Sequence, residues 1–317
     1  MKKYIIKRVL HSLFVIWLVA TAVFLSLRAI PGGPVQAMLG AEATPEAVEN
    51  LRADLGLDDP LYVQYVDWLT DLVRLELGTS LVQGVEISTL LAASAPRTFS
   101  IAIVGIIAGL AIAIPAGIIS ATRQHELSDY VATILAFLGL SLPAFFIGIL
   151  FALIFGVWLN WLPIFGYNSI RQEGFIEWFR SILLPGLAVG IPYAAIVMRM
   201  LRSSLLEVLD AEYMKTARAR GVNPRVRLYK HALQNALIPV VTVAGIQIAL
   251  IIVGSVTVEL VFGIQGLGRL LVDSILNQDY PVTQAVIILV AAIMVFSNLV
   301  VDILYTILDP RIRYDSG

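Results

Sequence analysis

The chain has 317 residues, of which 58% are hydrophobic and only 14% are charged, and its mean hydropathy is +0.85. A soluble domain carries roughly 25% charged residues, so this composition excludes a soluble globular protein and predicts an all-α protein that crosses a membrane several times. The absence of cysteine excludes disulfides, cysteine-bound iron–sulfur clusters and thiol chemistry.

Six segments are long enough to cross a bilayer, which takes about 20 apolar residues per helix. They are Val9–Ile30, Thr98–Ser120, Tyr130–Gly156, Ser181–Leu201, Leu237–Phe262 and Thr283–Ile307. These segments are expected to be helices, because a backbone in lipid must satisfy its own hydrogen bonds, and prolines such as Pro143 are expected to kink some of them. The first apolar run is longer than the core of a signal peptide and no Ala-x-Ala site follows it, so we expect residues 1–30 to be a retained helix.

Residues 31–97 form a long polar loop between the first two predicted spans. Its sequence predicts two short helices, one from Thr44-Pro45 to Gly56 and the other from Asp59-Pro60 to Gly78. The aromatic side chains of the second helix, Tyr62, Tyr65 and Trp68, are expected to anchor it at the membrane interface.

The distribution of charge predicts how the chain is oriented. Fifteen of the 22 Lys and Arg residues lie on the side of the N-terminus, whereas the loop 31–97 has ten acidic and three basic residues. Basic loops stay in the cytoplasm, so both termini are predicted to be cytoplasmic and the loop 31–97 external. The predicted organisation is completed by a five-helix core at 98–307, which contains a cytoplasmic loop at 202–236, and by a tail at 308–317.

The cytoplasmic loop contains the most basic part of the chain, "EYMKTARARGVNPRVRLYKHALQNALIP". Ser204 and Glu207 have the spacing of a capping box, and Asp210 is a second possible cap. A helix is expected at Ala211–Arg220, with Gly221 just after its C-terminus, and Asn223-Pro224 is typical of the start of the next helix. Without other information, a basic amphipathic helix resting on anionic lipid explains this segment equally well.

Several kinds of chemistry are absent from the sequence. None of the five lysines follows a glycine, so the chain has no P-loop, and it contains neither HExxH nor GxSxG. The three histidines are far apart, so no metal site is expected. The ionisable residues of the spans lie near span ends, and no catalytic residue is predicted. Three uncharged polar residues are candidates for a translocation path, namely Gln247, Ser255 and Asn298.

A glycine-rich stretch follows the fifth predicted span. Glu259 lies at the end of that span, and Gly266 and Gly268 follow it. Glycines allow tight packing of the backbone, so we expect an outer gate formed by Glu259, Gly266 and Gly268. A plain connection between two helices is the alternative.

Taken in order, several segments resemble one known family. They are "YIIKRVLHSLFVIWLV", "IPGGP", "LGLDDPLYVQYVDWL", "LELGTSL", "EYMKTARARGV", "HALQNALIPV", "ELVFGIQGLGRLLVDSILNQDYPV" and "LDPRIR". The chain resembles the permease subunits of bacterial ABC importers, in the dipeptide, oligopeptide and nickel branch. This resemblance implies a type I importer permease fold with six transmembrane helices, cytoplasmic termini, and a place in the bacterial plasma (inner) membrane.

The resemblance also implies a role for the basic loop. Importer permeases carry a cytoplasmic E-A-A-x-x-x-G motif that docks on an ATPase, and here Lys215, Thr216 and Ala217 occupy the E-A-A positions. The chain departs from the general motif and follows the peptide-branch form, "TARA-x-G". The coupling residues that the resemblance implies are Glu212, Tyr213, Lys215, Thr216, Ala217, Arg218, Arg220 and Gly221.

The implied assembly has a second homologous permease, two cytoplasmic ATPase subunits and an external substrate-binding protein, in contact with membrane lipid and without nucleic acid. ATP and magnesium would be held by the ATPases, and no cofactor by this chain. Di- and oligopeptides are the expected substrates, with nickel, glutathione and sugars as alternatives inside the family. A self-sufficient carrier or channel is the alternative outside it, whereas an intramembrane enzyme lacks a catalytic set.

Overall fold

The computed structural model describes residues 2–28, 46, 49 and 58–308, and the described part is helical apart from short connections. The helices are α1 (Lys2–Arg28), α4 (Leu61–Arg74), α5 (Ile87–Thr122), α6 (Leu127–Ser141), α7 (Ala144–Phe151), α8 (Ile170–Asp210), α9 (Glu212–Ala219), α10 (Pro224–Val226), α11 (Leu233–Val261), α12 (Leu267–Leu276) and α13 (Tyr280–Leu308). Two π-helical segments, η1 (Ala152–Trp158) and η2 (Arg227–Ala232), continue α7 and precede α11. The short helix predicted between Thr44 and Gly56, and the tail after residue 308, lie outside the described residues.

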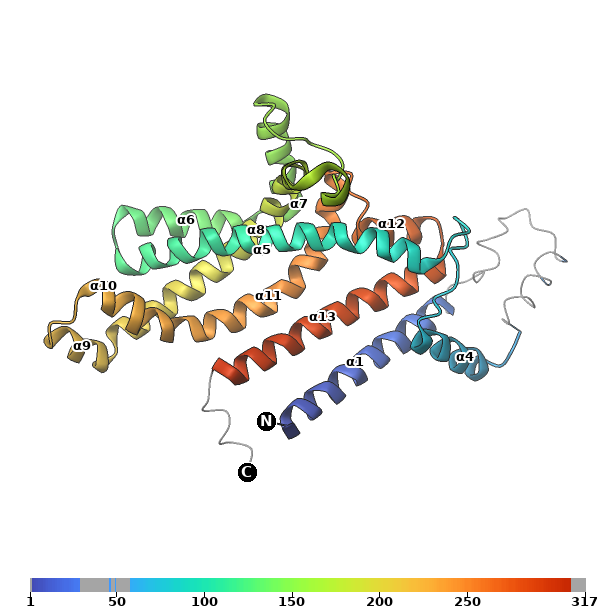
Figure 1. Ribbon diagram of the computed structural model, residues 1–317, viewed down its shortest axis with the longest axis horizontal. Coiled ribbons are helices and arrows are strands. Elements are labelled where there is room, and N and C mark those ends of the chain that lie inside the picture. Colours follow the sequence, from blue (N-terminus) through green and yellow to red (C-terminus); the bar gives the residue numbers. More distant parts are fainter. Residues whose placement is uncertain (1, 29–45, 47–48, 50–57, 309–317) are drawn as a thin grey trace.

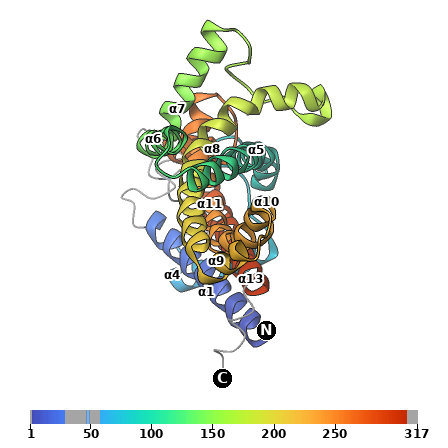
Figure 2. The ribbon, with the colours of Figure 1, turned by 90° about the vertical axis from the view of Figure 1, so that its left-hand side faces the viewer.

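Five helices of the described part are long and apolar enough to cross a membrane, and the number is six if one bent pair counts as a span. That pair is α6 with α7 and η1, which are bent by 107°. The span predicted at Tyr130–Gly156 is therefore two helices joined at a sharp bend. Pro143 lacks a backbone N–H and forces Leu142 into an extended conformation (φ −94°, ψ 129°), which ends α6. Beyond the break, α7 leaves the bundle at a steep angle (Figures 1 and 2).

The long helices lie side by side in the order α1, α13, α11, α8, with α5 and α6 beyond (Figure 1). Helices α5 and α8 form the centre, and glycines let their backbones touch. A Cβ atom on Gly190 would lie 2.6 Å from the backbone oxygen of Gly105, and one on Gly109 would lie 2.9 Å from that of Gly190. Small residues four apart allow this close approach in membrane helices.

Helix α4 folds back on the end of α1. The rings of Tyr65 and Trp68 each lie 5.1 Å from the ring of Phe24, and the hydroxyls of Tyr65 and Thr21 are 2.7 Å apart. Two of the three expected interface anchors therefore pack on α1, while Tyr62 is exposed. The helix starts after Pro60 as predicted, but it ends at Arg74 and not at Gly78, because Leu75 adopts a left-handed conformation (φ 61°).

The start and end of the chain meet on one side of the bundle. Helices α1 and α13 are antiparallel neighbours, and a guanidinium nitrogen of Arg8 lies 3.0 Å from a carboxylate oxygen of Asp302. In Figure 1 the beginning of α1 and the end of α13 both point toward the end of the molecule that carries α9 and α10.

Helix α8 is kinked at Gly174, which has non-helical dihedrals (φ 82°, ψ 171°), and from there it runs past Ser204 to Asp210. The capping box expected at Ser204 and Glu207 is therefore wrong. Leu201 and Leu205 are fully buried on the same helix, and this tertiary packing extends α8 through a spacing that is typical of helix starts.

We expect Gly190→Ala to destabilise the protein by about 1–3 kcal/mol, because the added methyl group must force apart two backbones in a filled interface. Gly254→Ala is the matched control, since nothing lies within 4 Å of its Cβ position, and it should be neutral or stabilising. Thermal unfolding of the purified variants in detergent measures the difference. Equal melting temperatures for the two variants would contradict the close packing of α5 and α8.

Candidate functional site

A short helix and a sharp turn protrude from the end of α8. Helix α9 is bounded by Ala211, which is extended (φ −64°, ψ 147°), and its chain reverses at Gly221, which has φ +71°. The predicted position of Gly221, just after the C-terminus of the helix, is confirmed, and the positive φ is the conformation in which glycine commonly ends a helix. A side chain there would meet nothing within 4 Å, so glycine is required for its backbone conformation rather than for space. The helix covers Glu212–Ala219, slightly shorter than predicted.

The helix start predicted after this turn, at Asn223-Pro224, is also confirmed. The side-chain oxygen of Asn223 accepts a hydrogen bond of 2.9 Å from the backbone N–H of Arg225, and Pro224 takes the first helical position. Helix α10 is followed directly by the π-helical segment η2, and η2 is followed directly by α11. The elbow at Gly221 thus connects two long helices of the core, α8 and α11.

Two contacts hold α9 against the bundle, while most of its residues face outward. Met214 is buried with 2% exposure, and the amide of Asn235 donates to the hydroxyl of Tyr213 at 2.9 Å. Lys215 and Glu212 form an exposed ion pair of 2.7 Å along the helix. Of the coupling residues implied by the resemblance, Ala217 is half-buried and the exposed ones are Glu212, Tyr213, Lys215, Thr216, Arg218, Arg220 and Gly221.

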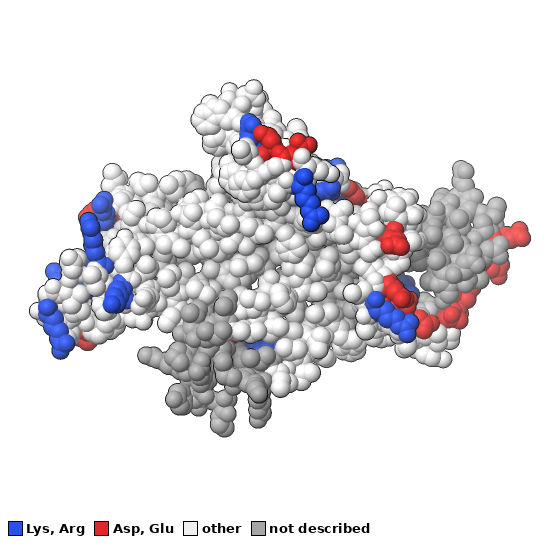
Figure 3. All heavy atoms as spheres, in the orientation of Figure 1, with Lys and Arg blue, Asp and Glu red and all other residues white. Residues whose placement is uncertain are grey.

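Charge separates along the long axis of the molecule. In Figure 3, Lys and Arg gather at the end that carries α9 and α10, and Asp and Glu gather at the opposite end near α4. Between these ends, a mixed group of charges lies on the protrusion at the top, and most of the rest of the visible face is uncharged. This is the pattern of a protein with an apolar belt in lipid and two different aqueous faces.

A buried ion pair lies between the basic end and the core. The guanidinium of Arg202 on α8 donates two hydrogen bonds of 2.9 Å to the carboxylate of Asp129 on α6. The hydroxyl of Ser120 on α5 donates to the same carboxylate at 2.5 Å, and the backbone N–H of His125 donates at 3.1 Å. The cluster joins α5, α6 and α8, and Arg202 lies eight residues before the C-terminal end of α8. Sequence reasoning missed it, because its partners are up to 82 residues apart.

A second buried cluster surrounds Glu259 at the other end of α11. Glu259 is fully buried, and its carboxylate accepts hydrogen bonds from the hydroxyl of Thr98 at 2.6 Å and the backbone N–H of Arg269 at 2.9 Å. The hydroxyl of Thr98 in turn accepts the backbone N–H of Leu267 at 2.8 Å. The carboxylate therefore binds the N-terminus of α12, where free N–H groups and the helix dipole favour negative charge.

The two glycines predicted for the outer gate touch this carboxylate. A Cβ atom on Gly266 would lie 2.5 Å from one carboxylate oxygen of Glu259, and a Cβ atom on Gly268 would lie 2.9 Å from the other and 2.5 Å from the backbone of Val256. The structure thus brings all three residues together. The motif ties the end of α11 to the start of α12 and to Thr98 on α5.

The three candidates for a translocation path do not form one site. Ser255 is fully buried and donates to the backbone oxygen of Ile252 at 2.7 Å, one turn before Glu259. Gln247 is half-buried on α11, and Asn298 is exposed on α13. Ser255 therefore belongs with the Glu259 cluster, and only Gln247 and Asn298 have surface that another molecule can reach in this chain.

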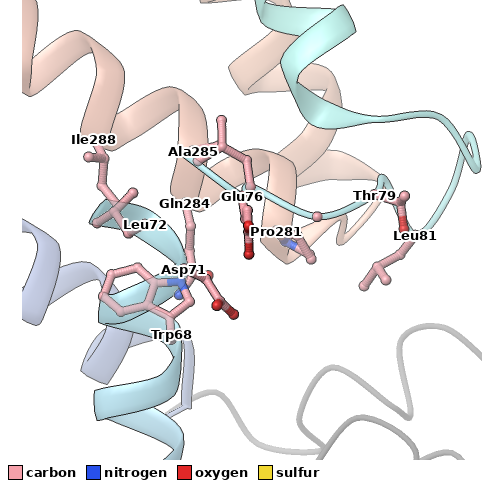
Figure 4. A pocket seen from close by; sticks show the side chains of 12 residues that line it. Trp68, Asp71, Leu72, Glu76, Thr79, Leu81, Pro281, Gln284, Ala285 and Ile288 are labelled. Carbon is pink, nitrogen blue, oxygen red and sulfur yellow. The ribbon is translucent and has the colours of Figure 1, made fainter. Parts of the chain in front are cut away.

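The acidic end contains a pocket of about 340 Å³ between α4 and α13 (Figure 4). Trp68 and Asp71 come from α4, Gln284 comes from α13, and Glu76 lies on the connection that follows α4. Nearby, the carboxylate of Asp279 is buried and accepts the hydroxyl of Ser80 at 2.5 Å, which fixes this connection to the start of α13. Among the described residues, no group of three or more His, Asp or Glu side chains has a geometry that holds a metal ion.

Nearly the whole chain matches known protein families. Residues 113–314 match the family described as "Binding-protein-dependent transport system inner membrane component", and residues 1–102 match its N-terminal part. A probable peptide ABC transporter permease of Sinorhizobium fredii is 40% identical over 98% of this chain and 99% of its own length. The oligopeptide permease AppB of Bacillus subtilis and the glutathione permease GsiC of Escherichia coli are each 38% identical, over 99% of this chain and 100% of their own lengths.

We expect Thr98→Val to destabilise the protein by about 1–3 kcal/mol, because it keeps the shape of the side chain but leaves the N–H of Leu267 without a partner in the core. Thr257→Val is the matched control, since that hydroxyl is exposed and bonds only within its own helix. Thermal unfolding reports stability, and limited proteolysis reports opening of the turn at 262–266. A Thr98→Val variant with the stability of the control would contradict the role of the cluster as a joint.

Proposed function

Because the chain belongs to the family of binding-protein-dependent transport system inner membrane components, we propose that it is the permease subunit through which an ABC importer moves di- and oligopeptides across the bacterial inner membrane. The names of its relatives specify peptides, oligopeptides and glutathione. Glutathione is itself a small peptide, so one substrate class covers all three names. Peptides are therefore preferred to nickel or sugars.

The observation that carries this proposal is the exposed helix α9 with its elbow at Gly221. Eight helical residues span about 12 Å, a length that fits one cleft on a partner protein. Helix α9 is held to the bundle by the buried Met214, and its other side is free for a partner. We infer that α9 is the coupling helix, that two cytoplasmic ATPase subunits dock on the assembled permeases, and that they supply the energy of transport.

The proposed assembly also contains a second, homologous permease and an external substrate-binding protein. The substrate would pass between the two permeases from the acidic outer end to the basic inner end. Motion of an ATPase would move α9, and α9 is tied directly to α8 and through η2 to α11. The ion pair of Arg202 with Asp129 would carry the same motion to α5 and α6, because it joins all three helices.

We expect Gly221→Ala and Ala217→Glu to lower peptide uptake and substrate-stimulated ATPase activity of the reconstituted complex at least tenfold while leaving assembly intact. Alanine at φ +71° costs about 1 kcal/mol of local strain, which a bundle of this size tolerates but which changes the angle of α9. Glutamate at position 217 places a charge on the half-buried side of the helix.

The control is the double variant Lys215→Gln and Arg218→Gln, which removes two exposed charges without changing the elbow. If α9 only rested on anionic lipid, this double variant would harm activity more than the two small-residue changes. Wild-type activity of Gly221→Ala and Ala217→Glu, together with loss of activity in the double variant, would refute the coupling-helix proposal.

We expect single cysteines in place of Glu177 and Asn277 to react with an impermeant thiol reagent added outside intact cells, and a cysteine in place of Lys215 to react only after lysis. Asn277 and Lys215 are exposed and Glu177 is half-exposed, and the chain has no cysteine of its own to compete. Asp279 is unsuitable as an outer position because its side chain is buried. Labelling of position 215 from outside would reverse the proposed orientation.

A further inference from the structure

A pocket of about 540 Å³ lies between α6, α8 and α11, on the half of the bundle that leads to α9. Arg199 on α8 lines it, and the guanidinium of Arg199 lies 5.2 Å from the centre of the ring of Phe137 on α6. The hydroxyl-bearing residues Thr133 and Ser203 also line it, and most of the remaining lining residues, such as Val243 on α11, are apolar.

The positive charge of Arg199 has no counter-charge in the described part of the chain. The other cation of the pocket, Arg202, is neutralised by Asp129, whereas Arg199 has an aromatic ring as its neighbour and no carboxylate within ion-pair distance among the described residues. An arginine in a membrane span is costly unless an anion or water meets it. Arg199 lies two residues before the end of the predicted span Ser181–Leu201, so its long side chain can reach the inner interface.

We propose that this pocket binds the phosphate headgroup of an anionic phospholipid of the inner leaflet, with Arg199 as its main ligand. A phosphate oxygen can accept hydrogen bonds from the guanidinium while the Phe137 ring holds the guanidinium in place. The apolar lining from α6, α8 and α11 offers a surface for the acyl chains. Basic pockets between transmembrane helices on the cytoplasmic side suit such headgroups.

The carboxylate of a transported peptide is the other anion that could reach Arg199. A peptide also carries backbone N–H and C=O groups, each of which needs a hydrogen-bond partner wherever it leaves water. The pocket offers few polar groups besides the two arginines and two hydroxyls, so its lining favours a lipid.

The test uses the full chain, purified in detergent and titrated with phosphatidylglycerol or phosphatidylcholine while bound lipid is counted by native mass spectrometry. Phosphatidylglycerol should bind more tightly than phosphatidylcholine, and Arg199→Gln should weaken it about fivefold. Arg123→Gln is the matched control, since Arg123 is an exposed arginine on the turn between α5 and α6 outside the pocket. Phe137→Leu keeps the charge but removes the ring, and it should weaken binding by a smaller factor.

Two competitors separate the sources of the anion. Neither inorganic phosphate nor the dipeptide Ala-Ala at millimolar concentration should displace phosphatidylglycerol. Displacement by phosphate would mean that the pocket binds any free anion. Displacement by the dipeptide, seen only when Arg199 is present, would mean that the pocket binds the transported peptide. Either result overturns the proposal, as does equal weakening by Arg123→Gln. If Arg199→Gln does not fold, Phe137→Leu decides, and unchanged lipid preference in that variant counts against the site.

Discussion

The backbone contact between α5 and α8 is the constraint on which the rest of the bundle depends. Gly105 and Gly109 on one helix meet Gly186 and Gly190 on the other, and there is no space between the two backbones for even a methyl group. Because lipid offers no hydrophobic drive for helices to associate, such close van der Waals packing must supply much of their attraction. Helix α11 packs on both helices, and α6 packs on their other side.

This central pair also connects the two polar clusters. Helix α5 contributes Thr98 to the Glu259 cluster near one end and Ser120 to the cluster of Arg202 and Asp129 near the other. Both clusters are buried and rich in hydrogen bonds, so each fixes the geometry of several helices at once. The two clusters therefore make α5 a direct structural connection between the basic end of α8 and the joint of α11 and α12. In the proposed transporter this is a mechanical link between nucleotide hydrolysis inside and substrate entry outside.

Local signals in the sequence predicted local structure well. The left-handed Gly221 and the start at Asn223-Pro224 depend on backbone chemistry within a few residues, and the structure has both. The G-x-x-x-G spacings of Gly105 with Gly109 and of Gly186 with Gly190 were also visible, and they would have predicted which two helices meet at the centre.

Features that depend on tertiary contacts were not predictable in the same way. Pro143 was recognisable as a source of a kink, but the 107° bend also reflects how α7 packs, with Gly148 against Phe262. Ser204 matched a helix start and lies inside α8, since buried leucines on both sides continue the helix. The sequence placed Glu259 at the end of a span and grouped it with Gly266 and Gly268, which contact it in the structure. Its hydrogen-bond partner Thr98 is 161 residues away, and no local pattern predicts that pairing.

The π-turn of η2 has a consequence for how α10 and α11 move together. A π-turn contains one residue more than an α-turn. The π-helical segment η2 could therefore become α-helical if its extra residue moved out of the turn, toward α10 on its N-terminal side. Such a conversion would turn α10 by about 100° about the helix axis and advance it by about 1.5 Å while α11 stays in place. Such a change of register in the segment after the elbow would reach Gly221 as a rotation and a small advance, without any shift of α11.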